Sequence, residues 1–383
     1  MQYRTFGKLE WKPSALGFGV MRLPLIEDDP AKIDEPEATR MIRYAIDRGV
    51  NYLDTAYGYH GGHSESFLGR ALKGGYREKV KLATKMPSWL VETREDFDKY
   101  LNQQLERLGI EHIDFYLLHA LNEASWRKLR DLGVREWSGK PLADGRIGYL
   151  GFSFHDTYRV FEQIADEHDW ALCQIQYNYI DVEYQAGIRG LQYAASKGLA
   201  VVVMEPLLGG HLANSPLQIQ SLWDTVLKER TPVDWALQWL WNQPEVSVVL
   251  SGMSTMGHVE ENVASASTSA VNTLTAGELA LIDRVRERYQ GLRPIPCTQC
   301  RYCMPCPNGV DIPRNFRLYN DGLIYENPGR SRRIYGWLSG DDAAADACLR
   351  CRECEAECPQ SIPISEWMPV VHAVLGEGKP YPR

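Results

Sequence analysis

The first 296 residues of this chain hold almost no cysteine. Cys173 is the single one among them, and the other eight of the nine cysteines follow in two short stretches. Cys173 lies in the apolar run ALCQIQYN, and we expect it to be a small buried residue of a strand. Since disulfides are disfavoured in a reducing compartment, the eight clustered cysteines indicate metal ligands.

Long apolar runs are also missing. No stretch of about 18 apolar residues occurs, so the sequence predicts no membrane span. The N-terminal residues MQYRTFGKLEWKPSALGFG lack the apolar core of a secretory signal peptide. We therefore expect a cytoplasmic protein.

An excess of positive charge is missing too. The chain has 42 lysines and arginines against 50 aspartates and glutamates, which gives a net charge of −8. This balance offers no electrostatic basis for binding nucleic acid or an anionic membrane. Hydrophobic residues make up 44% of the chain and charged residues 24%, as in ordinary globular proteins. A chain of 383 residues is long enough for one large domain and a small one.

Short apolar runs alternate with longer helix-like segments between about residues 15 and 285. Eight such runs occur: ALGFGVMRL, NYLDTA, VKLATKM, IDFYLLHAL, IGYLGFSF, ALCQIQYN, LAVVVMEPL and VSVVLSG. This alternation builds a parallel sheet with crossover helices. Eight units over this length favour a closed (β/α)8 TIM barrel, for which about 250 residues is typical. An open doubly wound sheet would require a glycine-rich phosphate turn after its first strand, and GFGVMRLP does not provide one.

A domain boundary is indicated by the stretch ERYQGLRPIP, which contains one glycine and two prolines. We therefore predict a barrel domain over residues 1–290 and a small domain over residues 291–383. The segment between the two cysteine stretches has the pattern of helices interrupted at Asn327-Pro328 and Ser339-Gly340. The small domain is thus predicted to be mainly α-helical.

Polar residues follow three consecutive predicted strands at the points where these strands end. Asp54 ends NYLD, Lys85 ends VKLATK, His119 ends DFYLLH, and Tyr59 lies in the loop after Asp54. Each residue alone has an ordinary structural explanation, such as a helix cap, a solvent-exposed amine or a core imidazole. In a barrel, however, the carboxyl ends of the strands carry the chemistry. Four such groups together favour an active site.

These four residue types suit acid–base chemistry on an oxygen atom. A phenol has an ordinary pKa near 10. A nearby ammonium lowers that pKa and makes tyrosine a usable acid or base near neutral pH. A buried lysine needs a counter-ion, which Asp54 can supply. A neutral imidazole can orient the incoming oxygen. The expected reaction is proton transfer to a carbonyl or from an alcohol.

At these residues the sequence resembles the aldo/keto reductases. The resemblance rests on DTAYGYHGGHSE, ATK, YLLH, GYLGFSFH, QIQYN, VVVMEPLLGG and SVVLSGMSTMGHVEEN, in the family's order, and covers about residues 1–290. It implies a (β/α)8 barrel, a nicotinamide cofactor bound without a Rossmann domain, and reversible reduction of a small carbonyl substrate to an alcohol. The catalytic tetrad of the family falls on Asp54, Tyr59, Lys85 and His119.

The resemblance also implies contacts to the nicotinamide. Ser153 and Gln174 match residues that hold the carboxamide, whereas Phe154 stands where the family has an asparagine. Met204 takes the place of an aromatic residue that stacks on the nicotinamide ring, and a thioether can lie against such a ring.

The rest of the cofactor falls on two later motifs. Leu207 and Gly209 of MEPLLGG are the implied backbone contacts of the pyrophosphate. Ser254 is an implied phosphate ligand, and Glu261 and Asn262 match the pair that binds adenine.

The 2′-phosphate that distinguishes NADP(H) from NAD(H) has no obvious partner. Many family members bind it with a lysine and an arginine, whose positions are taken here by Gly252 and His258. A strong 2′-phosphate site needs charge-assisted donors. Both cofactors are therefore retained as alternatives.

The two cysteine stretches have the spacing of iron–sulfur ligands. The first is C-x2-C-x2-C-x2-C-P and the second C-x2-C-x2-C-x3-C-P, which is the bacterial ferredoxin pattern. Structural zinc sites usually take two separated C-x2-4-C pairs, so we favour two [4Fe–4S] clusters over zinc. In the ferredoxin pattern the fourth cysteine ligates the other cluster. One predicted cluster is held by Cys297, Cys300, Cys303 and Cys358, and the other by Cys306, Cys348, Cys351 and Cys354.

The helical segment between the motifs resembles the α-helical two-cluster ferredoxins. The chain therefore resembles a subgroup of aldo/keto reductases with a C-terminal domain of this type. The clusters can be structural or redox-active, and we favour a redox role. Hydride transfer moves two electrons and a cluster passes one, so direct coupling would need a flavin or radical intermediate, and no flavin motif is visible. The alternative function is a nicotinamide-binding electron-transfer subunit with a ferredoxin-like partner.

Overall fold

The computed structural model describes residues 1–27, 29–226, 230–297, 299, 301–340, 343–358 and 360–382. The chain divides into two compact units. The first comprises residues 1–213 with 229–279, and the second comprises residues 214–228 with 280–383. The boundary predicted at residue 290 falls inside helix α11 (Ala276–Gly291). That helix belongs from Ala280 onward to the second unit.

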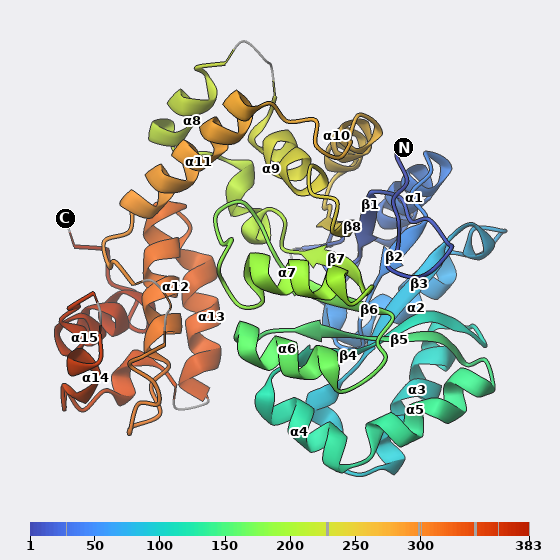
Figure 1. Cartoon of the computed structure of the whole chain (residues 1–383), viewed down its shortest axis with the longest axis horizontal. Helices are drawn as coiled ribbons and strands as arrows, with labels where there is room; N and C mark the ends of the chain where they lie inside the picture. Colours follow the sequence, from blue (N-terminus) through green and yellow to red (C-terminus); the bar gives the residue numbers. More distant parts are fainter. Residues whose placement is uncertain are drawn as a thin grey trace. The chain divides into compact units, whose positions relative to one another are not determined.

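Eight parallel strands close into a barrel in the first unit, in the order β1 to β8 (Figure 1). The predicted TIM barrel is thereby confirmed. The strands are β1 (Leu16–Gly19), β2 (Tyr52–Asp54), β3 (Lys81–Met86), β4 (Ile113–Leu121), β5 (Ile147–Phe154), β6 (Leu172–Gln176), β7 (Ala200–Met204) and β8 (Val246–Gly252).

These strands are nearly continuous runs of buried residues, as expected of a parallel sheet covered on both faces. Cys173 lies in β6 and is fully buried, as predicted. Gly17 in β1 permits close packing inside the barrel. A Cβ atom at that position would lie 2.7 Å from Leu250 and 2.8 Å from Val248.

Helices of the first unit follow the strands and cover the barrel. They are α1 (Glu35–Asp47), α2 (Ser64–Ala71), α3 (Glu95–Leu108), α4 (Glu123–Asp131), α5 (Val134–Ala143), α6 (Tyr158–Asp166), α7 (Gly187–Ser196), α9 (Pro232–Trp241) and α10 (Met256–Ser267). Short 3-10 segments are η1 (Tyr59–Gly62), η2 (Arg77–Lys79), η3 (Ser88–Leu90) and η4 (Leu208–Ala213). None of the helices in the described ranges is long and apolar enough to cross a membrane.

The N-terminal segment packs against residues at the beginnings of the barrel strands. The rings of Phe6 and Trp11 contact each other at 5.4 Å between centroids and lie against Tyr52 and Phe115. All but Trp11 are almost completely buried in one apolar cluster with the first residues of β6 and β7. This cluster fills the amino end of the barrel, so the carboxyl end is the one left for ligands.

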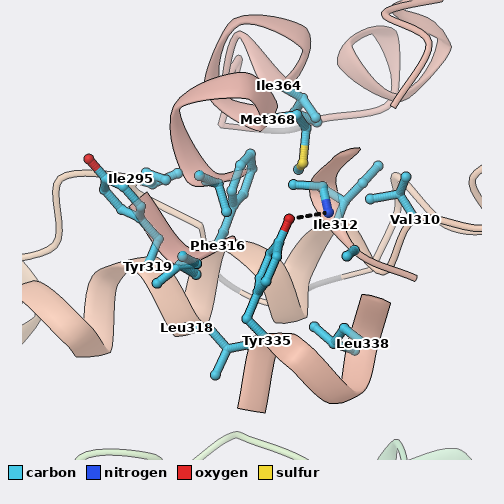
Figure 2. Packing of buried hydrophobic residues seen from close by; sticks show 14 of the residues in the cluster. Ile295, Val310, Ile312, Phe316, Leu318, Tyr319, Tyr335, Leu338, Ile364 and Met368 are labelled. Carbon is cyan, nitrogen blue, oxygen red and sulfur yellow. Dashed lines mark hydrogen bonds between the residues drawn. The ribbon is translucent and has the colours of Figure 1, made fainter. Parts of the chain in front are cut away.

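The second unit is mainly helical, as predicted. Its helices are α8 (Leu217–Trp223), α11, α12 (Ile312–Ile324), α13 (Pro328–Gly340), α14 (Glu353–Ala356) and α15 (Ile364–Leu375), with the 3-10 segment η5 (Ala345–Ala347). Phe316, Tyr335 and Met368 belong to an apolar core shared by α12, α13 and α15 (Figure 2). The backbone amide of Ala345 donates to the Tyr335 hydroxyl at 3.1 Å, which fixes η5 directly before Cys348.

Candidate active site and cluster-binding region

The four polar residues predicted at strand ends lie together at the carboxyl end of the barrel. Asp54 is the last residue of β2, Lys85 lies near the end of β3, and His119 lies near the end of β4. These strands are hydrogen-bonded neighbours, so their ends meet at one edge. Tyr59 begins η1, five residues after Asp54, and its hydroxyl turns back toward Lys85.

Lys85 connects two of these residues directly. Its Nζ donates to Asp54 Oδ1 at 2.6 Å, to the Thr55 carbonyl at 2.9 Å and to the Tyr59 hydroxyl at 3.4 Å. Burial alone would lower the pKa of Lys85, but the charges and hydrogen bonds of Asp54 and Tyr59 outweigh burial, so the pKa is raised. Lys85 is therefore a buried ammonium whose three donors all have acceptors.

Tyr59 behaves differently from the sequence-based expectation of a lowered pKa. Burial raises the pKa of Tyr59 and outweighs the lowering by the Lys85 charge, and Asp54 adds to the rise. Lys85 thus lowers the pKa of Tyr59, as expected, but the low dielectric of the buried site raises this pKa by more. Tyr59 is therefore a neutral phenol at physiological pH.

His119 completes the group as a neutral imidazole. Burial, together with the charges of Lys85 and His155, lowers the pKa of His119 well below its usual value. Its ring lies edge-on to Tyr59 at 6.0 Å and near Trp89 at 5.2 Å between centroids. The buried Nδ1 atom of His119 has no hydrogen-bond partner among the described residues. A polar ligand atom would satisfy it.

The predicted carboxamide residues lie side by side on neighbouring strands. Ser153 of β5 is in register with Gln174 of β6. Ser153 Oγ accepts the Ala120 amide at 2.7 Å, and Gln174 Nε2 donates to Met204 Sδ at 3.7 Å. Gln174 Oε1 is buried without a partner among the described residues. A carboxamide NH2 group is the kind of donor that this oxygen lacks.

Phe154 cannot replace the missing asparagine. Adjacent strand residues point to opposite faces, so Phe154 points away from the face of Ser153. Its buried ring packs edge-on against Phe161 of α6 at 5.2 Å between centroids. The position therefore serves the contact between strand and helix.

Leu207 and Gly209 lie in a tight turn after β7. Leu208, Gly209 and Gly210 have φ angles of 49°, 67° and 98°. The Leu207 carbonyl accepts the amides of Gly210 at 2.9 Å and Leu212 at 3.1 Å. Both predicted contact residues are partly exposed, and turns of this kind can point backbone N–H groups at an anion.

The adenine-end residues cluster around the start of α10. Ser254 and His258 are exposed, and the Ser254 amide donates to His258 Nδ1 at 3.4 Å. Asn262 is buried and donates to Ser251 Oγ at 3.0 Å. Glu261 accepts the Thr231 hydroxyl at 2.6 Å. All four side chains thus already have hydrogen-bond partners within the protein, because the Ser254 hydroxyl also donates to a backbone carbonyl.

Arg22 is a residue near this end that the sequence reasoning missed. A Cβ atom built on Gly252 would lie 3.1–3.2 Å from three side-chain carbons of Arg22. The Arg22 carbonyl also accepts the Ser254 hydroxyl at 3.0 Å. Arg22 therefore fills the space beside Gly252, where the resemblance places a family lysine.

Three cysteines of the first predicted cluster line one apolar pocket in the second unit. Cys297, Cys303 and Cys358 face it together, although Cys358 belongs to the second motif. Cys300 lies outside the described residues. The remaining lining residues are Arg301, Ile312, Pro313, Phe316, Gln360, Ile362 and Ile364. The pocket therefore draws its cysteines from both motifs.

The other four cysteines form a second group. Burial raises the pKa of Cys354 to about 11, and the neighbouring Cys306, Cys348 and Cys351 add to the rise. Cys306 belongs to the first motif, so this group is also drawn from both. Neighbouring thiolates repel one another, and binding to cationic iron would relieve this repulsion.

The backbone of the cysteine loops fits an anionic iron–sulfur cluster. Gln299, Arg301, Arg350 and Arg352 have φ angles of 62°, 64°, 56° and 67°. Such left-handed residues are unfavourable without glycine, yet they alternate with the cysteines in both loops. In the second loop Cys351 separates two such residues and does not share their positive φ, and alternation of this kind forms backbone nests that point N–H groups at anions, as in many Fe–S sites.

A single metal ion fits less well. Within the described ranges, no three His, Cys, Asp or Glu side chains lie close enough to hold one ion. Zinc draws four sulfurs to about 2.3 Å from one centre, whereas a four-iron cube holds its sulfurs at separated corners. Four cysteines at the spacing of these motifs are the donor set of a [4Fe–4S] cluster.

Comparisons with known proteins agree with both parts of the chain. Residues 15–287 match the model of the aldo/keto reductase family, and residues 296–362 match that of a 4Fe-4S dicluster domain. A probable aldo-keto reductase of Glycine max is 26% identical over 292 residues, which cover 67% of this chain and 82% of that protein. L-Galactose dehydrogenase of Arabidopsis thaliana is 27% identical over 293 residues, covering 69% and 88%.

A solved structure gives the same result. The holo form of an aldo-keto reductase from Bacillus halodurans has a TM-score of 0.63 and 26% sequence identity. The match covers 74% of this chain and 96% of that one. The barrel, the cysteine motifs and these matches together show that the chain is an oxidoreductase of the aldo/keto reductase family with a C-terminal 4Fe-4S dicluster domain.

Proposed function

We propose that the chain is an NAD(P)H-dependent reductase of aldehydes and ketones, which also oxidises the corresponding alcohols. The observation that carries this proposal is the contact of Lys85 Nζ with both Asp54 and the Tyr59 hydroxyl. It provides a neutral phenol beside a permanent positive charge, which is an arrangement for donating a proton to a developing alkoxide.

Tyr59 is the general acid of this reaction. When bound, a reduced nicotinamide would supply the hydride that reduces the carbonyl carbon. Tyr59 donates its proton to the carbonyl oxygen as negative charge develops there. Lys85 stabilises the resulting phenolate, since its ammonium lies 3.4 Å from that oxygen. Asp54 keeps Lys85 charged and fixes its direction.

His119 orients the substrate. Its low pKa keeps the imidazole uncharged, so it does not compete with Tyr59 as an acid. The unpartnered Nδ1 can form a hydrogen bond with the substrate oxygen or with a hydroxyl beside it. In the oxidative direction the same residues act in reverse, and Tyr59 must first lose its proton.

The residues predicted from the sequence would hold the nicotinamide cofactor in this proposal. Ser153 and Gln174 would hold the carboxamide, and Met204 would contact the ring. The orphaned Gln174 Oε1 supports this assignment. Leu207 and Gly209 would contact the pyrophosphate through their backbone. The adenosine end would be bound by Ser254, His258, Glu261 and Asn262.

The second unit holds two [4Fe–4S] clusters in this proposal. One is ligated by Cys297, Cys300, Cys303 and Cys358, and the other by Cys306, Cys348, Cys351 and Cys354. The pocket that groups Cys358 with Cys297 and Cys303 supports the interleaved assignment. Such clusters supply one-electron transfer when bound. Apolar residues such as Ile312 and Phe316 line this pocket and would exclude water from a cluster bound there.

A second candidate function is electron exchange with a ferredoxin-like carrier. It is favoured by the surface around the second cysteine group. Cys351 is exposed, and its neighbour Leu349 is 75% exposed. An exposed cluster edge shortens the path for an electron to a partner. Anaerobic addition of substrate and NADPH distinguishes the functions, because clusters that never change their EPR signal during turnover exclude this candidate.

Tyr59→Phe tests the main proposal. The variant removes the phenolic proton and keeps the ring. We expect turnover of aldehydes with NADPH to fall by about 10²- to 10⁴-fold, the usual contribution of a general acid. NADPH binding, measured by fluorescence titration, should remain unchanged. Unchanged turnover would contradict the role of Tyr59.

A further inference from the structure

A buried carboxylate lies behind the tetrad and takes no part in the chemistry described above. Glu65, the second residue of α2, is 0% exposed. Its Oε1 accepts the Thr84 hydroxyl at 2.6 Å and Gln104 Nε2 at 2.5 Å. Its Oε2 accepts a hydrogen bond from Arg107 Nη1 at 3.3 Å. A buried charge of this kind lowers stability unless its partners compensate for its lost hydration, so its presence needs an explanation.

One branch from Glu65 leads to Lys85. The Gln104 amide that donates to Glu65 also donates to the Lys85 carbonyl at 3.0 Å. Gln104 Oε1 accepts the Tyr116 hydroxyl at 2.7 Å, which orients the amide. Thr84, the residue before Lys85, is bound to the same carboxylate. Glu65 thus fixes the end of β3 at two consecutive residues.

The other branch leads to the loop that carries Tyr59. Arg107 Nη1 donates to the Tyr57 carbonyl at 3.2 Å, and the guanidinium lies 4.0 Å from the centre of the Tyr57 ring. Ser64, next to Glu65, shares a hydrogen bond of 2.9 Å with Thr55. The Thr55 carbonyl in turn accepts Lys85 Nζ.

We infer that Glu65 is a positioning residue that sets the distance between Lys85 and Tyr59. Its two oxygens hold the two chain segments that deliver these side chains, one through Gln104 and the other through Arg107. A single carboxylate on α2 therefore links β3 to the loop that carries Tyr59. The inference deepens the proposed carbonyl chemistry and rests on it.

Glu65→Gln is the informative substitution. A carboxamide has one oxygen that accepts hydrogen bonds, whereas the carboxylate has two. Its NH2 group would therefore face a donor, either Gln104 and Thr84 or Arg107, and the hydrogen bonds of that branch would be lost. Small misplacements of a catalytic group lower rates strongly, and we expect kcat to fall by about 10- to 100-fold. The affinity for NADPH should stay within about twofold, because Glu65 does not line the cofactor path.

Asp114→Asn is the matched control. Asp114 is also a buried carboxylate with three donors, Lys81 at 2.7 Å, Arg77 at 2.7 Å and the Leu82 amide at 3.0 Å. It lies at the start of β4, at the opposite end of the strand from His119. Its loss should lower thermal stability and leave kcat unchanged.

The decisive readout needs no turnover. The readout is the 13Cζ NMR resonance of Tyr59 at pH 8, which depends on the distance from the phenol to the Lys85 ammonium. The resonance is assigned as the one that is missing from the spectrum of Tyr59→Phe. We expect it to move in Glu65→Gln and to stay in place in Asp114→Asn. The shift of the Tyr59 resonance does not depend on catalysis, so it would occur even in a protein without carbonyl reductase activity. A failure of the proposed function can therefore be told apart from a failure of this inference.

A purely structural role for Glu65 gives a different outcome. Glu65→Gln would then lower the melting temperature while the Tyr59 resonance and kcat stay at their wild-type values, and the inference would be wrong. If Glu65→Gln does not fold, Arg107→Gln replaces it. Arg107 is 29% exposed, so its loss is better tolerated, and it breaks only the tyrosine branch. An unmoved resonance in Arg107→Gln would equally overturn the inference.

Discussion

The ammonium of Lys85 lies 2.6 Å from Asp54 Oδ1, and the two side chains are only 1% and 3% exposed. A buried pair of this kind is strongly destabilised when one partner is removed, because the other charge remains without compensation.

Asp54→Asn should therefore affect both stability and activity. We expect the free energy of unfolding to fall by about 3 kcal/mol, as for other broken buried pairs. Turnover should fall as well, since Lys85 loses the charge that keeps it protonated beside Tyr59. Chemical denaturation and steady-state kinetics measure the two effects. Wild-type stability in Asp54→Asn would show that the pair is not ionised.

The pH dependence should differ between the two directions of the reaction. The pKa of Tyr59 is raised above its ordinary value of 10, so the phenol keeps its proton below that pH. Carbonyl reduction should stay constant through the neutral range and decline only as pH rises through this pKa. Alcohol oxidation needs the phenolate and should increase with pH over the same range. A decline of the reductive rate centred near pH 7 would contradict a neutral Tyr59.

Arg22 should influence the choice of cofactor. Its side chain lies across Gly252, where it can replace the absent lysine as a partner of the 2′-phosphate. We expect Arg22→Gln to weaken NADPH binding by about tenfold, the loss of one charge-assisted hydrogen bond. NADH binding should change much less. Arg159→Gln, on the exposed face of α6, is the control, and fluorescence titrations give all affinities. Equal losses for both cofactors would rule out a 2′-phosphate contact.

The interleaved cluster assignment can be tested with serine variants. Cys306→Ser should damage the cluster of Cys348, Cys351 and Cys354, although it lies in the other motif. Cys358→Ser should damage the cluster of Cys297 and Cys303. Iron analysis and EPR of anaerobically purified protein distinguish the two clusters.

Cys173→Ser serves as the control for these variants. Cys173 is fully buried in β6 of the barrel and lies outside both cysteine motifs. The iron content of the Cys173→Ser protein should therefore equal that of the wild type. If Cys306→Ser instead damages the cluster of its own motif, each motif holds one cluster by itself.

Much of the barrel follows from local patterns in the sequence. Parallel strands bring their carboxyl ends to one edge, so the spacing of Asp54, Lys85 and His119 along the chain was enough to predict their meeting. The grouping of Cys358 with Cys297 could be predicted because ferredoxin motifs exchange their fourth cysteine.

Features that depend on packing could not be predicted in the same way. Glu65 follows the tyrosine loop in HGGHSE, but nothing in its spacing shows that Gln104 and Arg107 reach it from α3. The raised pKa of Tyr59 results from burial, which the sequence does not quantify. Helix α11 runs from Ala276 to Gly291 and the second unit begins within it at Ala280, so turn residues do not locate that division.

Transfer of deuterium from NADPH labelled at C4 tests the central claim most directly. The label should appear at the carbinol carbon of the alcohol formed from an aldehyde, under anaerobic single-turnover conditions. The transfer should slow by at least about 100-fold in Tyr59→Phe. An alcohol without deuterium, or equal transfer rates in the wild type and Tyr59→Phe, would contradict hydride transfer to a carbonyl protonated by Tyr59.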